Sequence, residues 1–292
     1  MHEPVLVEEA IRLLAPRPDG VYVDCTLGLG GHTRELIAAG AGRVIGIDRD
    51  PAALSEARDR LSDVRDRVEL VHDDYRHIAD VLESLGIREV HGVLADLGVS
   101  SMQLDRPERG FSFRHAGPLD MRMDPSRGMT LAARLATVDE PTLADIIWHF
   151  GEERHSRRVA RAILAARDRG DLGDTGALAA AVRRGAGGRG WQRIDPATRT
   201  FQALRIWVND ELAGLEAFLG PAWRVLARGG RLAVIAFHSL EDRLVKQTFR
   251  RLAGDPASAI LVTRRPVVAT ETEEARNPRA RSARLRVVEK VA

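Results

Sequence analysis

Three short apolar runs in the first third of the chain each end at or near an aspartate, and a glycine-rich turn follows the first run. The aspartates are Asp24, Asp48 and Asp96, and the turn is Gly28-Leu-Gly-Gly31. Glycines allow a backbone to approach a ligand closely, and the start of the next helix offers free N–H groups. Asp48 stands 20 residues after Gly28, where an acid can accept hydrogen bonds from both hydroxyls of a ribose. The pattern predicts a nucleoside site; the alternative is a plain tight turn.

The details of the turn restrict the kind of nucleoside. A dinucleotide fingerprint of the form G-x-G-x-x-G needs a third glycine where this chain has Thr33. No lysine of a triphosphate-binding loop follows the turn. We therefore expect a ligand that has a ribose and little need for phosphate contacts.

Further polar side chains stand where other apolar runs end. Tyr75 follows a further apolar run, residues 68–71, and could contact an adenine ring, although a partly buried surface tyrosine explains it equally well. His238 and Ser239 end a later apolar run. Ligands of parallel sheets bind at the carboxyl ends of the strands, so we expect Asp96 and His238 to face one site. The alternative for His238 is a cap of the helix that follows.

Strands and helices must alternate to bring these residues together. Helical patterns separate the apolar runs of the first third, which indicates βαβ units and a parallel sheet. Asp50 and Pro51 are suited to cap and begin the helix after the second strand. The strands are expected at residues 21–24, 43–47, 68–71, 90–94, 231–237, 260–263 and 284–288.

The alternation breaks after Asp105. The pattern predicts a long loop at 106–130, and then helices at 142–149, 152–169 and 175–184. One long amphipathic helix, with apolar residues from Phe201 to Leu219 at three- and four-residue spacing, precedes the returning strand. The predicted fold class is therefore α/β, a doubly wound sheet with an inserted helical domain. The sheet domain takes residues 1–105 and 206–292, and the insertion takes 106–205.

The net charge of +2 is unevenly distributed over the 292 residues. Residues 1–105 carry 11 basic and 20 acidic side chains, whereas 106–205 carry 18 and 12, and 206–292 carry 15 and 10. An acidic first third beside a basic remainder indicates that one part holds a small cofactor and another contacts a polyanion.

Two arginine-rich segments are candidates for that contact. In the predicted helix 152–169, Arg154, Arg158 and Arg161 share one face, although a solvated face is the simpler explanation of a single stripe. Residues 183–199 hold five arginines against one acid, Asp195. The second segment is the stronger candidate for phosphate contacts.

The composition excludes several classes of protein. With 44% hydrophobic and 29% charged residues, the chain resembles a globular protein and not a disordered or collagen-like one. Cys25 is the single cysteine, which excludes an internal disulfide and fits a reducing compartment. The apolar runs are far shorter than the ~18 residues that span a bilayer, and no signal peptide is visible. We expect a cytoplasmic protein without a membrane segment.

These residues, together with several further motifs, resemble the bacterial 16S ribosomal RNA (cytosine-N4) methyltransferase family, also called MraW. The resemblance runs from His2 to about Val288 and rests on the segments 24–32, 46–51, 96–101, 109–113, 117–124, 151–154, 196–203, 205–209, 237–242 and 277–282. It implies a class I fold that uses S-adenosyl-L-methionine and carries a helical insertion. It also implies methylation of N4 of one cytidine in the decoding region of the small-subunit RNA.

The resemblance further implies which residues hold the cofactor. These contacts fall on Gly30, Gly31, His32, Asp48, Tyr75, Asp96 and Gln103. The implied partner is 16S rRNA in the small ribosomal subunit; no obligatory protein partner and no metal are expected.

The chemistry of an amino nitrogen suggests the catalytic residues. The lone pair of the cytosine amino group is delocalised, so the site must accept its hydrogens and align it with the methyl group. We expect Asp96 to accept the amino hydrogens and His238 to take the proton. The target base must leave its stack to reach the site.

Other functions remain compatible with the residues alone. A methyltransferase could act on another nucleic acid, a protein or a small molecule, although a small substrate would not need a basic insertion. A nicotinamide-dependent oxidoreductase is disfavoured by Thr33. A non-catalytic ribosome-assembly factor could also keep a nucleoside site.

Overall fold

The computed structural model describes residues 4–187 and 195–292, which form two compact units. The sheet unit comprises Met1–Gly98 and Leu212–Ala292, and the helical unit comprises Val99–Glu211. The helical unit is thus longer at both ends than the insertion expected at 106–205. The reason is packing: Val99 and Val208, which flank the expected limits, both belong to the apolar core of the helical unit.

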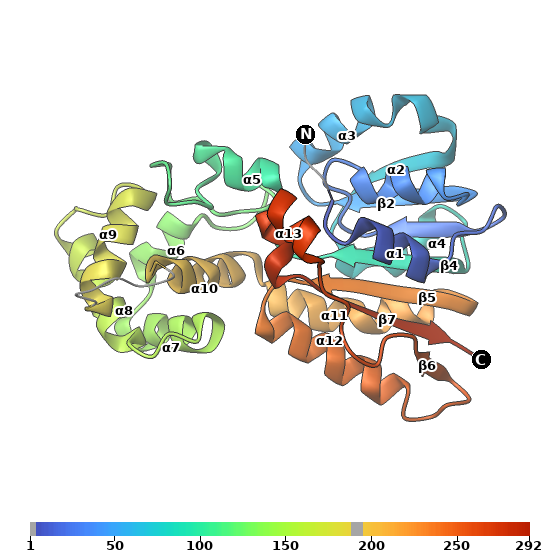
Figure 1. Cartoon of the computed structure of the whole chain (residues 1–292). Helices are drawn as coiled ribbons and strands as arrows, with labels where there is room; N and C mark the ends of the chain where they lie inside the picture. Colours follow the sequence, from blue (N-terminus) through green and yellow to red (C-terminus); the bar gives the residue numbers. More distant parts are fainter. Residues whose placement is uncertain (1–3, 188–194) are drawn as a thin grey trace. The chain divides into compact units, whose positions relative to one another are not determined.

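The sheet unit is built on a seven-stranded sheet in the order β3-β2-β1-β4-β5-β7-β6. Figure 1 labels β2, β4, β5, β6 and β7 of this sheet. The neighbours from β3 to β5 pair in parallel, and β7 runs antiparallel to both β5 and β6. This arrangement is the doubly wound α/β sheet that the sequence predicted. The strands are β1 Val21–Asp24, β2 Arg43–Asp48, β3 Val68–His72, β4 Val90–Asp96, β5 Leu226–Ala236, β6 Ala259–Leu261 and β7 Arg284–Lys290.

Helices cover both faces of this sheet. Side chains of α1 and α2 pack on one face, whereas side chains of α4, α11 and α12 pack on the other. Strand β4 serves both cores, because Val93 and Ala95 point to one face and Leu94 to the other, as the two-residue period of a strand requires. The helices are α1 Val7–Leu14, α2 Gly31–Ala38, α3 Pro51–Arg60, α4 Ile78–Ser84, α11 Glu211–Arg224, α12 Ser239–Leu252 and α13 Glu271–Arg276.

The capping residue of α3 is the one that the sequence indicated. The Asp50 side chain accepts a hydrogen bond from the Ala52 N–H at 3.1 Å, and Pro51 is the first residue of the helix. This cap fixes the turn that leaves the end of β2. Because β1 pairs in parallel with both β2 and β4, the carboxyl ends of these three strands meet at one edge of the sheet, which we call the carboxyl edge.

In the part of the helical unit that the structure describes, six helices pack around a core of their own. In this unit α7 packs against α8 and α10, and α8 packs against α9. The helices are α5 Ser101–Asp105, α6 Leu131–Thr137, α7 Glu140–Gly151, α8 Ser156–Asp168, α9 Thr175–Ala186 and α10 Ala197–Asn209. Within the described ranges, no helix of either unit combines the length and apolarity needed to cross a membrane.

Two helix predictions were wrong, and left-handed residues explain both. The expected single helix from Phe201 to Leu219 is broken at Asp210, whose φ is 49°. The Arg205 guanidinium holds the break by donating to both carboxylate oxygens of Glu211 at 2.8 Å. The helix expected from Glu152 begins only at Ser156, because Glu152 adopts φ 49° and ends α7.

Candidate functional site at the carboxyl edge

The glycine turn is fastened to the two strands on either side of β1. The Cys25 N–H donates to the Leu94 carbonyl of β4 at 2.8 Å, and the Leu27 N–H donates to the Ile47 carbonyl of β2 at 3.0 Å. Gly28 and Gly30 then adopt φ values of 52° and 78°, which other residues adopt only with strain. The turn therefore has one defined path between the strand ends before α2 begins at Gly31.

Asp48 lies at the end of β2 and holds the turn from one side. Its two carboxylate oxygens accept one N–H each, from Gly28 at 2.7 Å and from Asp50 at 2.8 Å. Burial raises the pKa of Asp48 to about 6, although both backbone N–H groups lower it. The side chain remains partly exposed, and a carboxylate oxygen can accept more than one hydrogen bond. Asp48 can therefore accept further hydrogen bonds from a ligand.

Asp24 holds the turn from inside, a role that the sequence analysis did not assign. Its Oδ2 accepts the Thr33 hydroxyl at 2.8 Å, and its Oδ1 accepts the Thr26 N–H at 3.3 Å. The Thr26 hydroxyl in turn accepts the Asp96 N–H at 2.6 Å. Thr33, which replaces the third glycine of a dinucleotide fingerprint, thus anchors α2 to β1. The signal in the sequence was the shared position of Asp24, Asp48 and Asp96 at strand ends.

Among the aspartates of the carboxyl edge, Asp96 has the pKa that is raised most. Its Oδ1 is buried and has no hydrogen-bond partner among the described residues, whereas the side chain as a whole is 23% exposed. Burial raises the pKa of Asp96 well above its ordinary value, and the charges of Asp24 and Glu241 raise it further. A buried acceptor without a donor is costly. The site therefore favours a ligand that brings an N–H or O–H donor to Asp96.

His32 lies beside Asp96 in the first turn of α2. Its Nε2 lies 3.0 Å from the Val5 carbonyl oxygen, so this nitrogen carries the proton and donates. Its Nδ1 lies 3.8 Å from Oδ2 of Asp96. Burial lowers the pKa of His32 to about 4, so the ring is neutral at neutral pH and does not offset the charge of Asp96.

Tyr75 lies in the core of the sheet unit more than at its surface. Its ring packs edge-on against Phe218 with the centroids 5.0 Å apart, and the side chain is 8% exposed. Tyr75 begins a short 3₁₀ turn after β3 and thus occupies the expected place beyond that strand. The alternative of a partly buried surface tyrosine is therefore wrong, because Tyr75 belongs to the buried core, and its contact with an adenine stays a prediction.

His238 caps α12. Its Nδ1 accepts the Glu241 N–H at 3.3 Å, and Oε2 of Glu241 accepts the N–H groups of Phe237 at 2.8 Å and His238 at 3.3 Å. This is the helix-capping alternative of the sequence analysis. Because the lone pair of Nδ1 is used by the cap, His238 can accept a proton there only by releasing the helix N–H.

Gln103 belongs to the helical unit. It is the third residue of α5 and completes a capping box, in which its Oε1 accepts the Ser100 N–H at 3.1 Å and the Ser100 hydroxyl accepts the Gln103 N–H at 3.2 Å. Gly30, Gly31, His32, Asp48 and Asp96 lie together at the carboxyl edge. The cofactor contact expected from Gln103 stays a prediction.

The residues of the edge fit a nucleoside with an amino group. Asp48 offers acceptors for a ribose diol, the turn at Gly28 and Gly30 presents backbone, and Asp96 offers an unused buried acceptor. S-adenosyl-L-methionine has a ribose, an adenine and an α-amino group and has no phosphate. The hydrogen-bonding groups at the carboxyl edge therefore match those of S-adenosyl-L-methionine.

The structure revises the expected arginine stripe. Arg154 precedes α8, Arg158 donates to the Gly185 and Ala186 carbonyls at the end of α9, and Arg161 pairs with Glu140 at 3.0 Å. These three side chains therefore do not form one free face.

The arginines of 183–199 are only partly described. The Arg183 guanidinium pairs with Asp195 at 2.7 Å, and an Arg199 nitrogen lies 4.0 Å from Oε2 of Glu153. Arg189 and Arg193 lie outside the described residues. Both of the paired arginines are already engaged with acids of the chain.

The amino-acid sequence matches known methyltransferases over nearly the whole chain. The family model of the MraW methylase family matches residues 1–291. A protein of Sorangium cellulosum named ribosomal RNA small subunit methyltransferase H is 52% identical over 290 residues, which cover 99% of this chain and 91% of the relative. A protein of the same name from Anaeromyxobacter dehalogenans is 51% identical, with 99% and 98% covered.

A solved structure shows a likeness of fold alone. The crystal structure of PH0851 has a TM-score of 0.50 at 13% identity, over 99% of this chain and 46% of that chain.

Proposed function

The chain belongs to the MraW methylase family, and we propose that it transfers a methyl group from S-adenosyl-L-methionine to N4 of a cytidine in the decoding region of 16S ribosomal RNA. The observation that carries the proposal is the partnerless, buried Oδ1 of Asp96 at the same sheet edge as the Asp48 carboxylate. The relatives named small subunit methyltransferase support the choice of ribosomal RNA as substrate.

The sheet unit binds the methyl donor at the carboxyl edge. Asp48 accepts the two ribose hydroxyls, and the backbone of the turn from Gly28 to Gly31 lies against the nucleoside, followed by His32. Tyr75 borders the adenine from the end of β3. The contact expected from Gln103, which belongs to the helical unit, stays a prediction. The bound donor supplies an electrophilic methyl group; the residues supply position and hydrogen-bond acceptors.

Asp96 prepares the amino nitrogen of the target base. An acceptor aimed at an amino hydrogen draws the nitrogen towards tetrahedral geometry and frees its lone pair for attack. Oδ1 has no partner within the described chain, and a carboxylate oxygen can accept more than one hydrogen bond. Asp96 can therefore accept from the target amino group as well as from the methyl donor. The raised pKa of Asp96 also makes its carboxylate a stronger base than an exposed aspartate.

His238 is the second candidate for the proton. Its Nδ1 serves the cap of α12, so a catalytic role requires that cap to open. His238→Asn separates the two roles, because asparagine also caps helices well. Loss of turnover with an unchanged melting temperature supports the catalytic role, whereas unchanged turnover assigns His238 to the cap alone.

The proposed function is tested with small ribosomal subunits that lack the modification. The protein is incubated with these subunits and tritiated S-adenosyl-L-methionine, and the labelled nucleoside is mapped by mass spectrometry. The proposal expects N4-methylcytidine at one position. Label on another base, on protein, or on nothing contradicts it, and the last result favours a non-catalytic assembly factor.

A further inference from the structure

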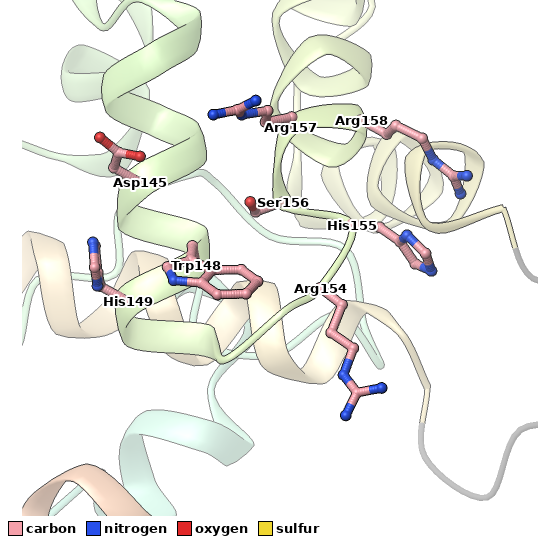
Figure 2. A pocket seen from close by; sticks show the side chains of 8 residues that line it. All are labelled: Asp145, Trp148, His149, Arg154, His155, Ser156, Arg157 and Arg158. Atoms are coloured by element: carbon pink, nitrogen blue, oxygen red, sulfur yellow. The ribbon is translucent and has the colours of Figure 1, made fainter.

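The turn between α7 and α8 borders an open cavity, lined mostly by exposed side chains, that the proposed chemistry does not use. The cavity has a volume of about 540 Å³, within the range of ligand sites. Figure 2 shows its lining, which comes from the last turns of α7 and from the residues that begin α8. The lining residues are Asp145, Trp148, His149, Arg154, His155, Ser156, Arg157 and Arg158.

Close helix packing fixes the position of this turn. A side chain at Gly151 would come within 2.7 Å of the Arg199 carbonyl oxygen, so the end of α7 lies directly on α10. On the other side, a side chain at Gly185 would come within 2.6 Å of the Val159 Cα, so α9 lies directly on α8. Backbone therefore touches neighbouring helices on both sides, which fixes the positions of the helices that carry the lining side chains.

The cationic side chains of the lining are available to an anion. Arg154 and Arg157 are exposed and form no hydrogen bond or ion pair with any other residue in 4–187 and 195–292. Arg158 is held in place by the Gly185 and Ala186 carbonyls and keeps its full positive charge there. Asp145 is the one acid of the lining.

The acids nearest to the lining in the chain do not cancel this charge. Glu153 is buried; its Oε1 accepts the His155 N–H at 2.8 Å, and its Oε2 lies 4.0 Å from Arg199. Glu152 is exposed and occupies the left-handed position that ends α7. Three guanidinium groups against one carboxylate leave the lining positive.

Trp148 adds an aromatic surface to this positive lining. It is 50% exposed, which is unusual for so large an apolar ring in a packed helical unit. Asp145, Trp148 and His149 have the three- and four-residue spacing that places side chains on one side of a helix. An exposed ring beside arginines is the combination with which proteins bind single-stranded nucleic acid, the base stacking on the ring and the phosphates on the guanidinium groups.

We propose that this cavity binds an unpaired nucleotide of the substrate RNA, with its base on Trp148 and its phosphates on Arg154 and Arg157. The inference rests on the proposed function for the identity of the RNA, and it adds an anchoring site within the helical unit. A positive cavity with an exposed aromatic ring suits a single strand better than a duplex, because the bases of a duplex are already stacked on one another.

The test uses binding of oligouridylate and methylation of small subunits by the full chain. In Trp148→Ala, we expect binding of oligouridylate to weaken about tenfold. In the double variant Arg154→Ala/Arg157→Ala, we expect the slope of log affinity against log salt to fall by about 1.4, since each phosphate contact on a single strand contributes about 0.7. In both variants KM for small subunits should rise, while kcat and KM for S-adenosyl-L-methionine stay unchanged.

Matched controls lie away from the cavity. Met129→Ala removes another half-exposed apolar side chain of the helical unit, and Arg65→Ala removes an exposed arginine of the sheet unit. Both controls should bind oligouridylate like the unmodified chain.

Three results would overturn the inference. In the first, the unmodified chain does not bind oligouridylate. In the second, the cavity variants bind it as well as the controls do. In the third, the cavity variants have a raised KM for protein-bearing small subunits but bind oligouridylate normally. The last result would assign the cavity to a ribosomal protein. If the cavity variants lose RNA binding while the unmodified chain methylates no small subunit, the inference stands and the proposed function fails.

Discussion

The carboxylates at the carboxyl edge of the sheet unit differ from two carboxylates of the helical unit in the direction of their pKa shifts. At the carboxyl edge of the sheet unit, burial raises the pKa of Asp24 and Asp48 to about 6 and that of Asp96 well above its ordinary value. In the helical unit, hydrogen bonds from Arg183 lower the pKa of Asp195, and hydrogen bonds that Asp139 accepts from Thr142 lower the pKa of Asp139. Among the described residues, no arginine or lysine forms an ion pair with a carboxylate of the first set, whereas those of the second set already have hydrogen-bond donors within the chain.

This difference indicates what each unit can bind. A buried carboxylate without a cation is relieved by a ligand that brings hydrogen-bond donors, such as ribose hydroxyls or amino groups. An exposed arginine without an acid, such as Arg154 or Arg157, is satisfied by an anion. The comparison therefore assigns the small donor to the sheet unit and the phosphate-bearing substrate to the helical unit.

The largest expected effect separates chemistry from RNA binding. Asp96→Ala removes the acceptor for the amino hydrogens, and we expect single-turnover methyl transfer to slow about 10³-fold. Affinity for small subunits should stay unchanged, because no part of the proposed RNA cavity is altered. Asp63→Ala, which removes an exposed carboxylate of the same unit, is the control. Near-normal transfer by Asp96→Ala would remove this residue from the chemistry.

The next effect concerns the donor alone. Asp48→Ala removes the acceptor of both ribose hydroxyls, and calorimetric titration should show about 30-fold weaker binding of S-adenosyl-L-methionine, since hydrogen bonds to a charged group are the strong ones. Binding of oligouridylate should not change. The assignment of the methyl donor to the sheet unit would be wrong if the affinity for S-adenosyl-L-methionine stayed unchanged. It would also be wrong if the affinities for S-adenosyl-L-methionine and oligouridylate fell equally.

A smaller effect follows from the pKa of Asp48. Ionised Asp48 accepts hydroxyl hydrogen bonds better than its protonated form, and its pKa is about 6. Donor affinity should therefore be constant above about pH 7 and fall up to tenfold for each pH unit below about 6. Calorimetry between pH 5 and pH 8 checks this profile. Affinity that rises on acidification would contradict the role of the carboxylate.

The smallest effect is on stability. The folded-state pKa of Asp96 is raised, so its contribution to stability is fully present below the pKa of the unfolded chain and is lost as the pH rises through the folded-state pKa. Asp96→Asn stays neutral and should raise the melting temperature by about 2–4 °C at pH 8, with no gain at pH 4. A lower melting temperature at pH 8 would show that the charge stabilises the fold.

Much of the sheet unit was predictable because its signals are local. Strand ends at Asp24, Asp48 and Asp96, and the helix start at Asp50 and Pro51, depend on apolar runs and caps that short windows of sequence reveal. The break at Asp210 was not predictable in this way, because the apolar period continues across it. Pairing of Arg205 with Glu211 and the left-handed backbone decide that break.

The site was predictable in its positions more than in its contacts. Spacing placed Asp48 and Asp96 at one edge, but the missing partner of Asp96 Oδ1 depends on atoms from several elements. The turn after Gly151 is a similar case, since the close approach of Arg199 from a distant helix fixes it. The sequence alone gave Trp148 no role, because exposure of an aromatic side chain is a tertiary property.

The most direct measurement of the central claim is a crystal structure of the chain with S-adenosylhomocysteine. The account predicts that the ribose hydroxyls lie within hydrogen-bond distance of the Asp48 carboxylate and that the turn from Gly28 to Gly31 contacts the nucleoside. A ligand bound elsewhere in the chain, or no bound ligand at saturating concentration, would contradict it.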